Sequence, residues 1–357
     1  MNLLEHEIHY PFAEEMPLQG SCLDVAPGVK WIRMGLPFAL NHINLWLLRD
    51  SFDDGAGRRE GWTVVDCCVA SDASRAQWEQ IFAEQLQGLP ILRVIVTHMH
   101  PDHIGLAHWL CERWQAPLWI SATDYHVALI ACKPPASHNL EGGAQNIAFY
   151  QRHGLDDPAF IEHVLHRTAY YPQLVPDLPT QFRRLMDHES LTIGAHAWQC
   201  IAGYGHAPEH MALYCADLQL LISGDMVLPR ISTNVSVHAN EPDSDPLGLF
   251  LDSLQRYLTL PENTLVLPSH GKPFQGLHTR IRQLQDHHAE RLDEVRTACA
   301  KGPTSAADVM RTMFRRTLNP HEMTFALGEA LAHLNYLWRR GEVQRHQSHD
   351  RPCTFQS

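Results

Sequence analysis

The sequence predicts an α/β protein, because short strand-like runs alternate with helix-like runs along most of its 357 residues. Residues 91–96 form a mostly apolar run with strand character, followed at once by a polar loop and a helix-like run. Two β-rich runs near the N-terminus, residues 40–48 and 62–69, flank a turn signal at residues 53–57 and predict a hairpin. Further β-rich pieces between residues 189 and 223 predict more sheet in the second half.

The helix-like runs between these strands are marked by capping residues and apolar spacing. Residues 104–114 predict a helix after the polar loop, and residues 118–121 predict the next parallel strand. Thr123 is expected to cap a short helix over residues 124–131. After residue 271 the pattern becomes helical, starting with a long amphipathic helix over residues 276–300.

Four potential metal ligands lie in the loop that follows residues 91–96. The loop reads Thr-His-Met-His-Pro-Asp-His, and the ligands are His98, His100, Asp102 and His103. Loops at the carboxyl ends of buried strands are where open α/β sheets place their sites. Imidazole nitrogens and carboxylate oxygens suit zinc and related divalent metals. The first two ligands can point the same way from extended backbone, while the turn after them lets the other two face a second point nearby.

At this loop the chain resembles the metallo-β-lactamase superfamily, whose signature is His-x-His-x-Asp-His after a strand. Three later segments resemble the rest of that pattern, in its order, at residues 203–210, 221–225 and 266–271. The resemblance runs from about residue 40 to 275. It implies a first metal ion held by His98, His100 and His206, a second held by Asp102, His103 and His270, and a bridging carboxylate from Asp225. Asp66 is expected to support the metal loop without binding metal.

The resemblance also implies the architecture, an αββα sandwich of two sheets packed face to face with helices outside. We expect a catalytic domain over residues 1–275. Within it, residues 132–187 form a longer connection between strands than a minimal lactamase-like fold has. We therefore predict a helical insertion or lid there. Residues 276–357 predict a C-terminal domain of helices and a short hairpin, similar to the small winged-helix domain that some lactamase-like hydrolases carry.

The implied cofactor is a pair of divalent metal ions, and the N and O ligands favour zinc while leaving iron and manganese open. The predicted reaction is attack of a metal-bridging hydroxide on the thioester or ester carbonyl of a small acyl substrate. A thiolate leaving group, with a pKa of about 8.5, departs without a general acid. Asp102 is expected to orient the hydroxide, and His210 is a candidate catalytic residue that contacts the substrate or supports the ligands. Arg230 and Lys272 are candidates to bind a substrate carboxylate or phosphate.

Two other functions remain as hypotheses. A phosphodiesterase or endoribonuclease similar to ribonuclease Z is one, since a two-metal site also suits attack on phosphorus. A non-catalytic sensor with a vestigial site is the other. The 15 basic and 31 acidic residues before Lys272, against 13 and 9 from it onward, support nucleic-acid binding only weakly.

Composition also bears on location and partners. The nine cysteines form no Cys-x-x-Cys pair and favour a reducing, cytoplasmic setting. The first twenty residues show no export-signal pattern, and no apolar run reaches the ~18 residues of a membrane span. The C-terminal helices are expected to pack on the core or to form a homodimer.

Overall fold

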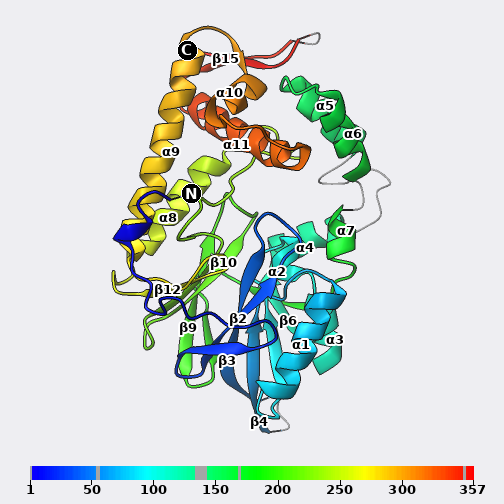
Figure 1. The fold of residues 1–357 in the computed structure, drawn as a ribbon, viewed down its shortest axis with the longest axis vertical. Helices are drawn as coiled ribbons and strands as arrows, with labels where there is room; N and C mark the ends of the chain where they lie inside the picture. The colour runs from blue at the N-terminus through cyan, green and yellow to red at the C-terminus, as the bar shows by residue number, and fades with distance from the viewer. Residues whose placement is uncertain (1, 54–56, 133–142, 168–169, 349–350) are drawn as a thin grey trace.

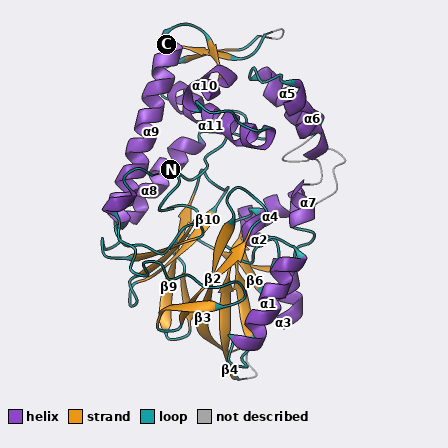
Figure 2. Cartoon of the chain, viewed as in Figure 1, coloured by secondary structure: helices purple, strands orange, loops and turns teal. Residues whose placement is uncertain are grey.

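The protein is a sandwich of two β-sheets with helices on both outer sides (Figure 1). The computed structural model describes residues 2–53, 57–132, 143–167, 170–348 and 351–357. The strands of the two sheets lie together, and helices of the C-terminal half stand beyond one end of them (Figure 2). The predicted αββα architecture is therefore confirmed.

The larger sheet has seven strands in the order β1-β2-β3-β4-β5-β6-β7. Pairing is antiparallel from β1 to β4 and parallel from β4 to β7. The predicted hairpin is the β3–β4 pair, and its tip at residues 54–56 lies outside the described residues. The strands are β1 (Cys22–Ala26), β2 (Val29–Gly35), β3 (His42–Asp53), β4 (Arg58–Val65), β5 (Ile91–Ile95), β6 (Leu118–Ser121) and β7 (Phe182–Leu185).

The smaller sheet has five strands in the order β12-β11-β10-β9-β8. Only β11 and β12 pair in parallel, so their carboxyl ends lie at the same edge of the sheet. The strands are β8 (Ser190–Ile193), β9 (His196–Gly203), β10 (His210–Cys215), β11 (Leu220–Gly224) and β12 (Leu265–Pro268).

Apolar side chains fill the space between the two sheets. Trp31 and Trp46 stack there with ring centroids 6.4 Å apart, beside buried Trp198 of the opposite sheet. A second apolar layer lies between the larger sheet and the helices α1 (Asp72–Glu84), α3 (Ala107–Trp114) and α4 (Ala122–Ala131). The helix predicted at residues 104–114 is in fact two, because α2 (Pro101–Ile104) ends two residues before α3 begins.

The start of α4 also differs from the prediction. Ser121 is its N-cap, since the Ser121 side chain accepts a hydrogen bond from the backbone N–H of Asp124. Thr123 is not the cap, and its hydroxyl donates to Glu209 at 2.8 Å. The strand and the helix follow each other without a linker, which places the cap two residues earlier than expected.

Helices of the C-terminal half share one apolar core with the smaller sheet. They are α8 (Pro246–Tyr257), α9 (Leu277–Ala300), α10 (Ala306–Met313) and α11 (Pro320–Arg339). In this core α8 packs against β9, α10 packs on α9, and α11 packs on α8 and α9. A small sheet of β13 (Thr304–Ser305), β15 (Thr354–Gln356) and β14 (Gln344–His346) closes this end of the molecule. The predicted apolar stripe of α9 is buried at each of its positions, Ile281, Leu284, His288, Leu292 and Val295.

The segment predicted as a helical insertion contains α5 (Ala144–Arg152), α6 (Pro158–His166) and α7 (Tyr170–Leu174). Its residues 133–142 and 168–169 lie outside the described part of the chain. Phe149, Tyr150 and Phe160 are buried in the same core as α10 and α11, so α5 and α6 pack on the C-terminal helices. Near its end the segment returns to the larger sheet as β7, a strand that the sequence did not predict.

A short 3-10 helix, η1 (Glu5–Glu7), lies near the N-terminus. No helix in the described ranges combines the length and apolar character needed to cross a bilayer. All nine cysteines are free.

Candidate metal centre

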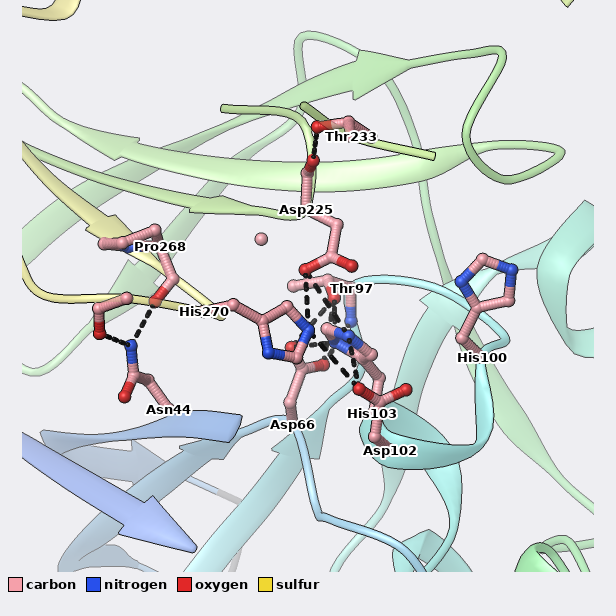
Figure 3. A network of polar contacts seen from close by, with 12 residues as sticks. Asn44, Asp66, Thr97, His100, Asp102, His103, Asp225, Thr233, Pro268 and His270 are labelled. Carbon is pink, nitrogen blue, oxygen red and sulfur yellow. Dashed lines mark hydrogen bonds and ion pairs between the residues drawn. The ribbon is translucent and has the colours of Figure 1, made fainter. Parts of the chain in front are cut away.

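Every predicted ligand lies just beyond the carboxyl end of a strand. The first four follow β5, His206 follows β9, Asp225 follows β11, and His270 follows β12. Because these strand ends share one rim of the sandwich, residues from 98 to 270 meet at a single point. Figure 3 shows the Asp225 carboxylate facing His103 and Asp102, with His270 beside them.

Three histidines form the first ligand set. His98 Nε2 lies 2.9 Å from His100 Nδ1 and 3.2 Å from His206 Nε2, and the latter two atoms are 3.1 Å apart. Two nitrogens bound to one tetrahedral zinc ion are about 3.3–3.4 Å apart, given Zn–N bonds of 2.0–2.1 Å. The triad therefore has nearly the spacing that one small divalent cation requires.

The second set combines two histidines with two carboxylates. His270 Nε2 lies 3.4 Å from Asp102 Oδ2 and 3.5 Å from Asp225 Oδ1. His103 Nε2 lies 3.8 Å and 3.6 Å from the same two oxygens. The other oxygen of Asp225, Oδ2, is 3.3 Å from His206 Nε2 of the first set. Asp225 thus turns one oxygen toward each set, as a bridging ligand would.

Buried atoms in this cluster show that the residues fit a pair of cations. His103 Nε2 and Asp225 Oδ1 are both buried and have no hydrogen-bond partner among the described residues. A buried polar atom without a partner is costly, and a metal ion at these positions would satisfy both. Within the described part of the chain, three groupings of His and Asp could each hold an ion, and they consist of the seven predicted ligands.

Hydrogen bonds from outside the cluster orient the ligand rings. The Nδ1–H groups of His206 and His270 donate to the carbonyl oxygens of Asn234 and His42, each at 2.7 Å. His103 Nδ1 lies 2.8 Å from Asp66 Oδ2. In each ring the proton is therefore on Nδ1, which leaves the Nε2 lone pair for a metal.

Asp66 has the supporting position that the sequence predicted. It accepts hydrogen bonds from the backbone N–H of Thr97 at 2.8 Å and from the Thr97 hydroxyl, besides its contact with His103. Its backbone has φ +63°, an uncommon conformation for a residue other than glycine. Such strain gathers at functional sites, and here it aims the carboxylate at the ligand loop.

The two ligand sets differ electrostatically in the metal-free protein. Burial, reinforced by the other histidines, lowers the pKa of His98 and brings that of His100 to about 3. Burial also opposes protonation of His103, but Asp66, Asp102 and Asp225 together raise its pKa to about 9. For Asp102, burial is outweighed by the charges of His103 and His270, which bring its pKa to about 2.

His210 lies beside two of the predicted ligands, His98 and Asp225. It is fully buried, its ring centroid is 5.0 Å from that of His98, and its Nε2 accepts a hydrogen bond from the backbone N–H of Asp225 at 3.3 Å. Of the two roles predicted for it, these contacts support the one that holds a ligand in place.

Arg230 and Lys272, predicted to bind substrate, have partners elsewhere. Arg230 forms an ion pair with Glu5 at 3.2 Å, and Lys272 forms one with Glu14 at 3.1 Å while donating to the Ala13 carbonyl. Both carboxylates belong to the N-terminal segment, not to the metal cluster. The substrate-binding role of both residues stays a prediction.

Sequence reasoning missed Asp124, Tyr171 and the backbone carbonyls that orient the ligand rings. Asp124 is buried and accepts hydrogen bonds from Met99 and Glu209. Its position in the sequence could have indicated this role. Asp124 follows β6, and β6 runs parallel to β5, so both strands end at the rim that carries the ligand loop.

The comparisons with known proteins agree with this geometry. A model described as the metallo-beta-lactamase superfamily matches residues 42–270, and one described as the metallo-beta-lactamase-like C-terminal domain matches residues 292–357. The chain belongs to the metallo-β-lactamase superfamily. The first match spans all seven predicted ligands.

Three similar proteins match most or all of this chain. The crystal structure of a beta-lactamase domain protein from Burkholderia ambifaria is 51% identical, with a TM-score of 0.90 over 100% of this chain and 99% of that one. A metallo-beta-lactamase family protein from Thermus thermophilus, TTHA1429, is 26% identical with a TM-score of 0.75, over 93% and 99%. A probable metallo-hydrolase of Bacillus subtilis, YqjP, is 24% identical over 86% of this chain and 91% of its own length. The two solved structures therefore share the fold over nearly the whole of this chain, including its C-terminal part.

Proposed function

We propose that this protein is a dinuclear zinc-dependent hydrolase that cleaves a thioester or ester of a small acyl compound. The observation that carries the proposal is the Asp225 carboxylate, which directs one oxygen to each of two complete ligand sets. Two cations held this way would supply an ionised water at neutral pH and polarise a carbonyl.

Exposure of the ligands gives the direction of substrate approach. The Asp102 side chain is 17% exposed, whereas those of His103, His206 and His270 are at most 5% exposed. The substrate carbonyl therefore approaches from the side of Asp102. Asp102 accepts a hydrogen bond from the attacking water and turns its lone pair toward the carbonyl carbon.

Charge favours an acyl substrate over a nucleic acid. The part of the chain before Lys272, which carries every ligand, has twice as many acidic as basic residues. Of the 13 basic residues from Lys272 onward, eight are in ion pairs with carboxylates among the described residues. A surface already neutralised in this way is poorly suited to a phosphate backbone.

The experiment is a substrate panel with protein loaded separately with zinc, iron or manganese. The panel contains glutathione thioesters, acyl-CoAs, lactones, bis(p-nitrophenyl) phosphate and RNA. We expect turnover of at least one acyl class by the zinc form and its loss in Asp225→Ala. Turnover confined to phosphodiesters would replace the proposal with the nuclease alternative, and a fully loaded protein inert to every compound would favour the sensor.

A further inference from the structure

Asp124 joins two loops that carry ligands of the first metal set. Its Oδ1 accepts a hydrogen bond from the backbone N–H of Met99 at 2.8 Å, and its Oδ2 accepts one from the backbone N–H of Glu209 at 2.7 Å. Met99 stands between His98 and His100, and Glu209 is three residues after His206. One buried carboxylate thus holds both loops that supply the three-histidine set.

Helix capping alone does not explain this carboxylate. Asp124 occupies the third position of α4, where an acidic side chain commonly accepts from the N-cap backbone. Here the Ser121 hydroxyl caps the helix, and the backbone donors that reach the Asp124 carboxylate come from the two ligand loops. Burial raises the pKa of Asp124 to about 6 although the donors lower it, so at neutral pH the group is an acceptor.

Tyr171 holds the same point of the first loop from the other side. Its hydroxyl donates to the Met99 carbonyl at 2.5 Å, and its side chain is buried. Both polar groups of the Met99 backbone are therefore bound, the N–H by α4 and the C=O by α7. The Thr123 hydroxyl adds a third link by donating to Glu209 Oε2.

We propose that Asp124 and Tyr171 are positioning residues that fix the separation of the His98–His100 loop from the His206 loop, and so set the affinity of the first metal. Neither side chain is a predicted ligand. The rings of the second set have other anchors, because Asp66 contacts His103 and the His42 carbonyl accepts from His270. The proposal rests on the dinuclear centre and is independent of the acyl substrate.

The test measures metal release rather than turnover. Zinc-loaded protein is titrated with a competing chelator, and the two ions are assigned by comparison with His206→Ala and His270→Ala. In Asp124→Asn the amide keeps one acceptor oxygen but turns an NH₂ group toward the second backbone N–H. We expect the first ion to bind about 10–100-fold more weakly, as is typical when a group supporting a ligand is lost, with the second ion little changed.

Two further variants separate positioning from general stability. Asp50→Asn is the matched control, because Asp50 is equally buried but pairs with Arg93 away from the ligands. It should leave both affinities unchanged. Tyr171→Phe removes only a hydroxyl and should weaken the first ion by a smaller factor even if Asp124→Asn does not fold.

Wild-type affinity for the first ion in Tyr171→Phe or in folded Asp124→Asn would overturn the proposal. Equal losses at both ions in Asp124→Asn and Asp50→Asn would overturn it as well. Because no substrate is used, a wrong substrate class would leave these results unaffected.

Discussion

Replacing Gly224 by alanine should destabilise the metal-free protein and displace Asp225. Gly224 has φ +53°, and a Cβ added there would lie 2.0 Å from Nε2 of the buried His210 ring. That ring cannot move freely, since its Nε2 accepts a hydrogen bond from the backbone N–H of Asp225. The glycine before the bridging aspartate is therefore needed for both its backbone conformation and the space beside it.

The expected loss has two parts. A non-glycine residue in the left-handed conformation costs about 1–2 kcal/mol, and forcing extra volume into a packed interior typically costs about 1–3 kcal/mol more. Gly224→Ala should thus lower the free energy of unfolding by about 2–5 kcal/mol. Gly88→Ala is the matched control, because Gly88 has φ +73° with nothing within 4 Å of the added Cβ, so only the backbone part of about 1–2 kcal/mol applies.

Urea unfolding of the metal-free variants measures both values, and elemental analysis gives their metal content. The double variant His210→Ala/Gly224→Ala should be less destabilised than the sum of its single changes, because the clash is gone. Equal losses of stability in Gly224→Ala and Gly88→Ala would refute the steric argument, as would strict additivity in the double variant.

Three further changes test other parts of the structure. In the folded protein the pKa of His103 is about 9, above its ordinary value of 6.5. The charged ring therefore stabilises the metal-free fold fully below about pH 6.5, and this stabilisation is lost as the pH rises through 9. Urea unfolding should accordingly show a larger deficit for metal-free Asp66→Asn at about pH 6.5 than at about pH 9.5, and a deficit independent of pH would contradict this assignment. Asp50→Asn leaves the Arg93 guanidinium buried without its carboxylate and should cost about 3–5 kcal/mol in urea unfolding, whereas unchanged stability would show that the pair contributes nothing. Arg230→Ala should leave KM for the acyl substrate unchanged because its side chain pairs with Glu5, and a raised KM would support the predicted substrate-binding role.

The residues that cluster at the candidate metal centre could be predicted because each is carried by a short local motif at a strand end. The spacing of His98, His100, Asp102 and His103 within one loop states their chemistry without tertiary information. The later motifs add one ligand each. His206 follows β9, Asp225 follows β11 and His270 follows β12, so each motif could be recognised at the end of its own strand. The αββα layers were implied by the family resemblance that these motifs carry.

The contacts that support the site could not be predicted in this way. The role of Asp124 depends on backbone donors at Met99 and Glu209, which are distant in sequence and have no side-chain signature. For Arg230 and Lys272, closeness to the ligands along the chain did not indicate where long side chains point, and both reach the N-terminal segment. The strand β7 was missed because its pairing with β6 is long-range.

Counting the metal ions bound per chain tests the central claim most directly. Protein saturated with zinc and freed of excess ions should contain two ions per chain, and Asp225→Ala should contain one or none, with nearly all hydrolytic activity lost. Two ions and full activity in Asp225→Ala, or a wild-type protein that retains none, would contradict the account of a carboxylate-bridged pair.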